Sequence, residues 1–522
     1  MAMYMTQALH RLTQQRPDAP AAVDDVETLS WRALAERTAK VAGLLQSLGL
    51  QPGDRVAMLS RNSVDFFAYI LGTWWAGGVI NPVNLRWSVG EIAFSLRHCE
   101  SRILIVEAPF ATLIPAIREQ APCLRHVLTI GIGESADQPD YRHAVAAAVP
   151  VKDTRRGGDD LAAVLYTGGT TGKPKGVMLS HGNLAGSLFG SMAFGRAHER
   201  YLHTAPLFHI GALSGLFVAL YSDTTSHFLP LFDPEAVLRA IALHAIDELF
   251  LVPAMLRMVV DHPDFASYRT ASVRRIRYGA SPIDAGLMDR ALAAFPNAGF
   301  FQAYGMTELS PVATVLPEPD HHDRASTRLR SAGKATPTVE LRIVDVDRQE
   351  LPRGAVGEIT VRGPGVMLGY WDAPQATAEV LRDGWMHTGD LGRMDADGYV
   401  TVVDRLKDMI ITGGENVYSA EVETALSTHP AVAQAAVIAM PDDKWGERVH
   451  AVVILRPGEA AAAEELTAHC RATLAGYKVP RSYDFVDTLP LSGAGKVLKN
   501  VLRDAARARQ EAELAARAAV VG

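Results

Sequence analysis

Residues 166–177, YTGGTTGKPKGV, carry the strongest chemical signal in the sequence. They follow an apolar run, residues 161–166, whose composition predicts a strand. Glycines expose backbone N–H groups that can surround an anion, threonine hydroxyls add donors, and lysines add positive charge. These residue types indicate a phosphate-binding loop. The spacing is not that of GxxxxGK[ST], because Thr167 stands five residues before Gly172 and a proline follows Lys173. On composition alone, an ordinary surface loop remains the alternative.

Four other segments carry side chains suited to a polar site. His209 lies in PLFHIGAL, Glu308 in QAYGMTE, Asp390 in HTGDLG, and Lys496 in PLSGAGKVLK. A carboxylate such as Glu308 suits a hard cation like Mg²⁺, which commonly uses one or two carboxylates together with phosphate oxygens. Taken singly, each residue also has a plainer interpretation: a core histidine, a helix start, a turn-forming aspartate and a solvated lysine.

Alternating helix and strand patterns must position these residues. Short apolar runs at 55–59 and 102–106 predict strands, and helical spacing at 34–48 predicts a helix. The uncharged run 66–80 is too short to cross a bilayer and predicts a buried helix followed by a strand. The apolar run at 205–220 predicts core in the same way. Strands that alternate with helices indicate an α/β architecture with parallel sheet.

The pattern changes toward the C-terminus. Further strands are expected at 271–278 and 300–304, and each ends in a glycine-containing turn. From 339 to 403 the short runs VELRIVDV, GEITVRG and GYVTVVDR predict an antiparallel sheet or barrel. Helix and strand alternate again after Arg405. The tail at 504–519 is rich in Ala, Arg and Glu and predicts a solvated helix.

In this order the motifs resemble those of the adenylate-forming (ANL) superfamily, which includes acyl-CoA synthetases, adenylation domains of peptide synthetases and firefly-type luciferases. The resemblance covers essentially the whole chain and adds YGASP at 278–282 and DRLKDMIITGGENVYSAEVE at 404–423. Two departures stand out. The family often has Ser where this chain has Gly168, which removes one phosphate-facing hydroxyl, and many relatives have Pro at the position of Ser419, which could instead cap the following helix.

The resemblance implies an α/β fold with a large N-terminal AMP-binding and acyl-binding domain at 1–404. That domain would combine α/β subdomains with a β-barrel-like subdomain. A small mobile α+β C-terminal domain at 405–522 would carry the catalytic lysine, and the hinge would lie at Lys407.

The resemblance also implies the roles of individual residues. Catalytic roles fall to Lys496, Thr307, Glu308 and His209, and Glu308 would also bind Mg²⁺. Asp390 and Arg405 would hold the ribose, and Gly413 and Gly414 would line the path of CoA. The remaining nucleotide and acyl contacts would come from Thr167, Gly168, Gly169, Thr170, Thr171, Gly172, Lys175, Gly279, Ala280, Ser281, Gln302, Ala303, Tyr304 and Gly305.

The implied reaction joins a carboxylic acid and ATP into acyl-AMP and pyrophosphate, and then transfers the acyl group to CoA. Acetate-specific relatives carry a Trp at the position of Gly305, so glycine there implies a deeper pocket for an apolar acid. A medium- or long-chain fatty acid is the expected substrate. An aryl acid such as a cinnamate, or a carrier-protein thiol in place of CoA, are the alternatives. A non-catalytic nucleotide-binding protein is disfavoured because Lys496, Glu308 and Thr307 are all present.

Composition excludes several other classes. The 522 residues carry 51 basic and 58 acidic side chains, a net charge of −7, which does not favour nucleic-acid binding. Three scattered cysteines signal neither a disulfide framework nor a zinc site. The N-terminus lacks the apolar core of a signal peptide, and no run is long enough to span a membrane, so a cytoplasmic enzyme is expected. Small-molecule acid, ATP and CoA are the expected partners, and a homodimer is left open.

Overall fold

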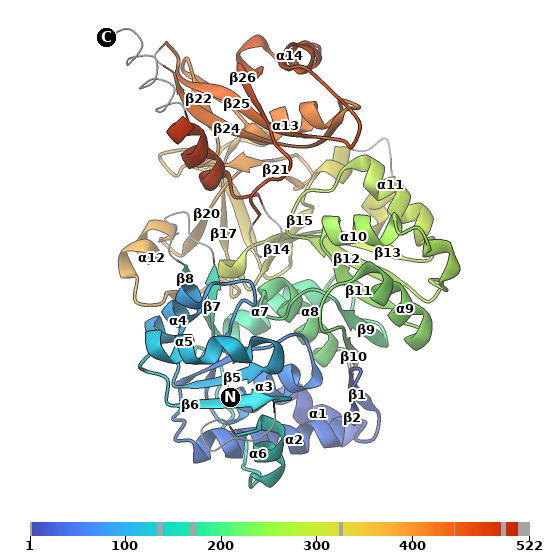
Figure 1. The fold of residues 1–522 in the computed structure, drawn as a ribbon, viewed down its shortest axis with the longest axis vertical. Coiled ribbons are helices and arrows are strands. Elements are labelled where there is room, and N and C mark those ends of the chain that lie inside the picture. The colour runs from blue at the N-terminus through green and yellow to red at the C-terminus, as the bar shows by residue number, and fades with distance from the viewer. Residues whose placement is uncertain are drawn as a thin grey trace. The chain divides into compact units, whose positions relative to one another are not determined.

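The computed structural model describes residues 3–132, 139–167, 174–322, 327–442, 444–491 and 497–509. The chain divides into two compact units (Figure 1). The first contains Met1–Leu341, Val361–Met386 and Gly398–Val400, and the second contains Arg342–Thr360, His387–Asp397 and Thr401–Gly522. Each unit has its own hydrophobic core.

A seven-stranded sheet lies in the first unit. Its order is β18 (Gly369–Tyr370), β8 (Lys175–Ser180), β7 (Leu161–Thr167), β4 (Val79–Pro82), β3 (Arg55–Leu59), β5 (Ile103–Glu107) and β6 (His126–Ile130). The strands from β7 to β6 pair in parallel, whereas β8 is antiparallel to both of its neighbours. The accompanying helices are α2 (Trp31–Ser47), α3 (Val64–Trp75), α4 (Val89–His98), α5 (Ile114–Gln120) and α6 (Tyr141–Ala147).

A nine-stranded sheet completes the first unit. Its order is β15 (Lys334–Ala335), β14 (Val312–Leu316), β13 (Gly299–Gly305), β12 (Arg275–Gly279), β11 (Glu248–Leu251), β9 (Arg200–His203), β10 (Thr225–Phe228), β1 (Pro20–Val23) and β2 (Thr28–Ser30). Its helices are α1 (Gln7–Gln15), α7 (His181–Met192), α8 (Ile210–Tyr221), α9 (Pro234–His244), α10 (Pro253–Val260) and α11 (Ala285–Ala294). Helices α9, α10 and α11 pack beside β11, β12 and β13 over an apolar core (Figure 1).

A further sheet contains β16 (Glu340–Val344), β17 (Gly357–Arg362), β19 (Leu381–Arg382), β20 (Trp385–Met394) and β21 (Val400–Arg405), and α12 (Pro374–Val380) precedes β19. The last sheet contains β23 (Glu415–Val417), β22 (Ile410–Thr412), β25 (Gly446–Leu455), β24 (Val432–Asp442) and β26 (Ser482–Phe485). Helices α13 (Ser419–Ser427) and α14 (Ala463–Arg471) contribute to its core, and a final helix begins at residue 499.

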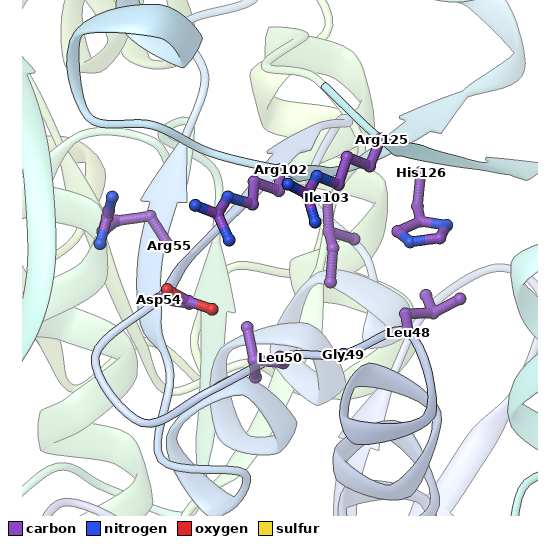
Figure 2. A pocket seen from close by; sticks show the side chains of 9 residues that line it. All are labelled: Leu48, Gly49, Leu50, Asp54, Arg55, Arg102, Ile103, Arg125 and His126. Carbon is purple, nitrogen blue, oxygen red and sulfur yellow. The ribbon is translucent and has the colours of Figure 1, made fainter. Parts of the chain in front are cut away.

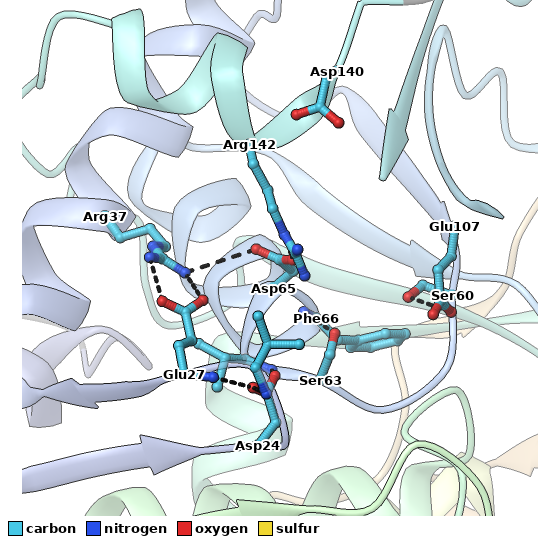
Figure 3. A network of polar contacts seen from close by, with 12 residues as sticks. Asp24, Glu27, Arg37, Ser60, Ser63, Asp65, Phe66, Glu107, Asp140 and Arg142 are labelled. Atoms are coloured by element: carbon cyan, nitrogen blue, oxygen red, sulfur yellow. Dashed lines mark hydrogen bonds and ion pairs between the residues drawn. The ribbon is translucent and has the colours of Figure 1, made fainter. Parts of the chain in front are cut away.

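A buried carboxylate ties three helices of the first unit together (Figure 3). Asp65, on α3, lies 2.7 Å from Arg142 of α6 and 3.8 Å from Arg37 of α2. Arg37 also pairs with Glu27. Burial raises the pKa of Asp65, and the two guanidinium groups oppose that rise. The network therefore supports the scaffold rather than a reaction.

The sequence-based fold class is confirmed: the structure is mixed α/β with a large N-terminal and a smaller C-terminal domain. The strands expected at 55–59, 102–106, 161–166, 271–278 and 300–304 are β3, β5, β7, β12 and β13. The helix expected at 34–48 is α2, and the uncharged run 66–80 is α3 followed by β4. No helix among the described residues is long and apolar enough to cross a membrane. A boundary at 404/405 stays a prediction, since the compact units divide at other positions.

Candidate active site

The expected phosphate loop connects two paired strands. Thr167 ends β7, Lys175 begins β8, and the two residues are antiparallel partners. Both are half-buried. The loop positions Gly168, Gly169, Thr170, Thr171 and Gly172 lie outside the described residues, and so does Lys496.

Glu308 is buried and is held from a neighbouring segment. It lies in the short 3₁₀ helix Thr307–Leu309, directly after β13, with Thr307 half-buried beside it. The phenol of Tyr370 donates a hydrogen bond of 2.8 Å to Glu308 Oε1. The Lys175 ammonium lies 4.9 Å from the centroid of the Tyr370 ring. The structure thus gathers Lys175 and Glu308, two predicted site residues, around a tyrosine that the sequence analysis did not select.

The ends of β12 and β13 bring together two other predicted motifs. The strands are parallel, and Gly279 is the partner of Ala303. A Cβ on Gly279 would lie 2.3 Å from the Ala303 carbonyl oxygen, so only glycine allows this close approach. Ala280 follows with φ of 69°, a left-handed conformation that costs a non-glycine residue energy. Ala280 and Ser281 are exposed, whereas Gln302 and Tyr304 are half-buried.

Tyr278 and His321 support these strand ends from inside. The Tyr278 hydroxyl lies 2.9 Å from His321 Nε2 and 3.4 Å from Gln302 Oε1. The other ring nitrogen of His321 lies 3.0 Å from the Pro317 carbonyl oxygen. Burial lowers the pKa of His321, which favours the neutral ring. His321 stands far from every recognised motif, and no local pattern in the sequence marks it.

Gly305 has a structural requirement that the sequence analysis overlooked. A Cβ at this position would lie 1.8 Å from the carbonyl oxygen of Pro311. The backbone of β13 therefore approaches the start of β14 too closely for any side chain. The role of Gly305 as the floor of the acyl pocket stays a prediction, but a bulky substitution there would displace backbone before it could fill a pocket.

His209 occupies the connection between β9 and α8. Its carbonyl accepts hydrogen bonds from the amides of Ala212 and Leu213, so it forms the N-terminal boundary of α8. Its ring is half-buried, with its centroid 4.4 Å from that of Phe208. The apolar run 205–220 is expected to be core, and α8, which covers most of it, is buried along most of its length.

In the second unit, Asp390 and Arg405 form an ion pair of 2.7 Å. Asp390 is buried, and its amide donates to the Thr388 hydroxyl at 3.1 Å. Leu406 donates its amide to the Gly389 carbonyl at 2.8 Å, which fixes the turn after Arg405 against β20.

Lys407 follows in this turn and is exposed. Gly413 and Gly414 form the turn between β22 and β23, and both have positive φ values, 61° and 86°. The amide of Gly413 donates to the Trp445 carbonyl at 2.8 Å. A Cβ at Gly413 would also lie 2.7 Å from the Trp445 ring, so glycine is required by conformation and by space.

A buried polar network lies around the start of α13. Asp404 accepts from both the amide and the hydroxyl of Ser419. Lys499 lies 2.7 Å from Glu423 Oε1 and donates to the Ser419 hydroxyl at 2.6 Å. Ser419 is therefore not the cap of α13: Tyr418 occupies that position, and the Ser419 hydroxyl serves this network.

A pocket of about 60 Å³ lies elsewhere, at the beginning of β3, β5 and β6 (Figure 2). It is lined by Arg55, Arg102, Arg125 and His126 among others, and by none of the predicted site residues. Arg55 is engaged by Glu100 at 3.1 Å and by the Cys99 carbonyl. Parallel strands expose their carboxyl ends at the opposite edge, so this pocket is separate from the end of β7, where Thr167 lies.

Comparison with known proteins shows the family of the chain. Residues 9–371 match the model of the AMP-binding enzyme family, and residues 421–496 match the AMP-binding enzyme C-terminal domain. A feruloyl-CoA synthase from Amycolatopsis sp is 39% identical over 94% of this chain and 97% of its own length. The long-chain-fatty-acid–CoA ligase FadD13 of Mycobacterium tuberculosis is 36% identical over 90% of this chain and 91% of its own.

Solved structures of similar proteins share the fold. ATP-bound MatB from Rhodopseudomonas palustris has a TM-score of 0.87 at 33% identity, covering 96% of this chain and 99% of that one. The anthranilate CoA ligase AuaEII, in complex with anthranoyl-AMP, has a TM-score of 0.89 at 26% identity, covering 98% of both chains. The chain therefore belongs to the AMP-binding enzymes of the adenylate-forming superfamily, as an acyl-CoA synthetase, an AMP-forming acid–thiol ligase.

Proposed function

We propose that the enzyme activates an apolar carboxylic acid, a medium- or long-chain fatty acid, as acyl-AMP and then transfers the acyl group to CoA. The observation that carries the proposal is the cluster of Glu308, Tyr370 and Lys175 beside the strands that flank the glycine-rich loop. A fixed carboxylate and a lysine at such a loop suit a triphosphate.

The chemistry explains why both half-reactions are needed. The carbonyl carbon of a carboxylate carries a poor leaving group, so a thiol cannot convert a carboxylate directly into a thioester. Attack of the carboxylate on the α-phosphate of ATP forms the acyl–phosphate bond and releases pyrophosphate, and AMP then leaves when the CoA thiolate attacks. The first step joins two anions and therefore depends on charge neutralisation and orientation. Lys175, Thr307 and Lys496 are proposed to provide them.

The residues present fit Mg²⁺ as a partner of the nucleotide. Among the described residues no group of three or more His, Cys, Asp or Glu side chains could hold a metal by itself. A single buried carboxylate, Glu308, is what a cation that also binds phosphate oxygens requires. Mg²⁺ bound there would offset phosphate charge during adenylation.

Asp390 and Arg405 are proposed to hold the ribose, with the Asp390 carboxylate accepting from its hydroxyls. Lys407 is proposed as the hinge about which the C-terminal domain rotates between the two half-reactions. Movement of such elements controls the steps of many enzymes. Gly413 and Gly414, which carry no side chains in an exposed turn, leave room for the thin arm of CoA.

An aryl acid is the second candidate, and the identity to feruloyl-CoA synthase favours it. A carrier-protein thiol is the alternative acceptor, because a fatty acid–[acyl-carrier-protein] ligase, ScoC of Streptomyces coeruleorubidus, is 36% identical over 94% of both chains.

Pyrophosphate release with a panel of acids, with and without CoA, tests the proposal. The panel contains acetate, octanoate, palmitate, cinnamate and ferulate. We expect acid-dependent release, highest for octanoate or palmitate, and acyl-CoA formation only with CoA present. Highest activity with ferulate would replace the fatty acid by the aryl acid. Release that depends on neither acid nor thiol would refute the ligase.

A further inference from the structure

We propose that Tyr370 is a positioning residue for Glu308, and that its hydroxyl orients the Glu308 carboxylate toward a divalent cation bound with the nucleotide. The inference rests on the proposed function, because Glu308 as a metal ligand is itself part of that proposal. None of the motifs quoted in the sequence analysis includes Tyr370, which lies in the segment LGYWD.

Tyr370 reaches Glu308 from a fixed backbone. It lies on β18, where it pairs with Val177 of β8, and its amide donates to the Thr377 hydroxyl at 2.9 Å. The same segment is tied to Glu308 a second time, because the Met367 amide donates to the Glu308 carbonyl at 2.9 Å. The hydroxyl of Tyr370 is therefore held in place, at 2.8 Å from Oε1.

The ring of Tyr370 also contacts a cation. The Lys175 ammonium lies over the ring, where the negative face of an aromatic ring attracts a cation. One side chain thus bridges the lysine that begins β8 and the carboxylate that follows β13.

The element that carries Glu308 is short. The 3₁₀ helix that carries it has three residues and no side-chain hydrogen bond at its N-terminal cap. A carboxylate ligand is commonly oriented by a second hydrogen-bonding residue, and loss of that residue typically weakens metal binding by about 10–100-fold. A hydrogen bond that only stabilised the fold would leave metal affinity unchanged.

The test compares Tyr370→Phe with Tyr399→Phe in the full-length chain. Tyr370→Phe removes the hydroxyl and keeps the ring that faces Lys175. Tyr399→Phe is the matched control, because the buried Tyr399 hydroxyl also donates to a carboxylate, Asp320 Oδ2, at 2.7 Å. Mn²⁺ binding in the presence of a non-hydrolysable ATP analogue is followed by electron paramagnetic resonance. The Mg²⁺ dependence of pyrophosphate release is measured in parallel.

We expect Tyr370→Phe to weaken Mn²⁺ binding by about tenfold or more and to raise the Mg²⁺ requirement equally, while Tyr399→Phe binds Mn²⁺ as the wild type does. In a Glu308→Ala background, Tyr370→Phe should have no further effect, because the two residues act through one bond. Unchanged Mn²⁺ affinity in Tyr370→Phe, or an equal loss in Tyr399→Phe, overturns the inference alone. A wild type that binds no Mn²⁺ with nucleotide overturns the proposed metal site and the inference together.

Discussion

Arg405 Nε lies 2.7 Å from Asp390 Oδ1, in an ion pair that joins β20 to the last residue of β21. The two partners differ in exposure: the Asp390 side chain is 6% exposed and that of Arg405 is 40% exposed. A buried carboxylate next to a half-exposed guanidinium can accept further hydrogen bonds from a ligand without losing its counter-charge.

Removal of this carboxylate should weaken ATP binding. Asp390→Ala is expected to raise the KM for ATP by roughly 10–100-fold, because hydrogen bonds to a charged group contribute about 1.5–3 kcal/mol. Arg393→Ala, an exposed arginine on the same strand, is the control and should leave KM unchanged. Steady-state kinetics with varied ATP give both values. A large fall in melting temperature with unchanged ATP use would assign the pair to the fold instead.

Lys496 is expected to act in one half-reaction only. Lys496→Ala should slow adenylation by roughly 100-fold or more, the scale of losing one donor to a transition state. Thioester formation from supplied acyl-AMP should survive much better. Rapid-quench measurement of each half-reaction separates the two, and equal losses would contradict this division.

The hinge prediction concerns Lys407. Proline fixes φ near −65° and cannot donate a hydrogen bond, but the backbone around Lys407 is a turn in which the neighbouring amides of Leu406 and Asp408 make the contacts. Lys407→Pro should hold one orientation, so that acyl-AMP accumulates while little acyl-CoA forms, and a circular-dichroism melt establishes that the variant is folded. Lys407→Ala should retain both steps. Normal turnover by the proline variant would place the hinge elsewhere.

The Lys499–Glu423 pair should matter for stability in a pH-dependent way. Burial raises the pKa of Glu423, and the Lys499 ammonium opposes that rise. The folded state thus holds a proton on Glu423 at pH values where the unfolded chain has released it, so stability falls as pH rises through this range. Lys499→Met should raise that pKa further and cost about 3 kcal/mol at pH 8, and clearly less at pH 5.

Lys478→Met is the control for this prediction. Lys478 pairs with Glu421 at 2.8 Å, but Glu421 is 41% exposed, and such surface pairs contribute about 0–1 kcal/mol. Thermal unfolding at the two pH values compares the variants. Equal losses at pH 5 and pH 8 in Lys499→Met would show that the charge of Glu423 is not the cause.

The sequence predicted the fold class well because its signals are local. Periodicity marks α2 and α3, and apolar runs mark β3 and β5, since each element's pattern is contained in its own residues. The resemblance predicts that Asp390 and Arg405 each bind the ribose; the structure shows the two side chains in contact, and their role stays a prediction.

What the sequence did not predict depends on tertiary contacts. Tyr370 meets Glu308 across 62 residues, and Lys499 meets Ser419 across 80, with no pattern in either segment to mark the contact. Ser419 was expected to cap a helix by local preference, but a buried Asp404 competes for its hydroxyl and its amide. Gly305 was assigned to a pocket, whereas its closest constraint is the Pro311 backbone.

The return of the chain from residue 361 to 386 into the first unit bears on how the protein is made. Strand β18 is the edge of a sheet whose other strands all end by residue 180. Nearly 200 further residues must therefore be synthesised before the last strand of this sheet can pair. Contacts between distant segments form slowly, because the connecting chain must be closed first. A ribosome-bound fragment that ends near residue 341 should therefore contain Glu308 and Lys175 without the tyrosine between them. During synthesis, the expected metal site should reach its full metal affinity only after residue 370 has left the ribosome.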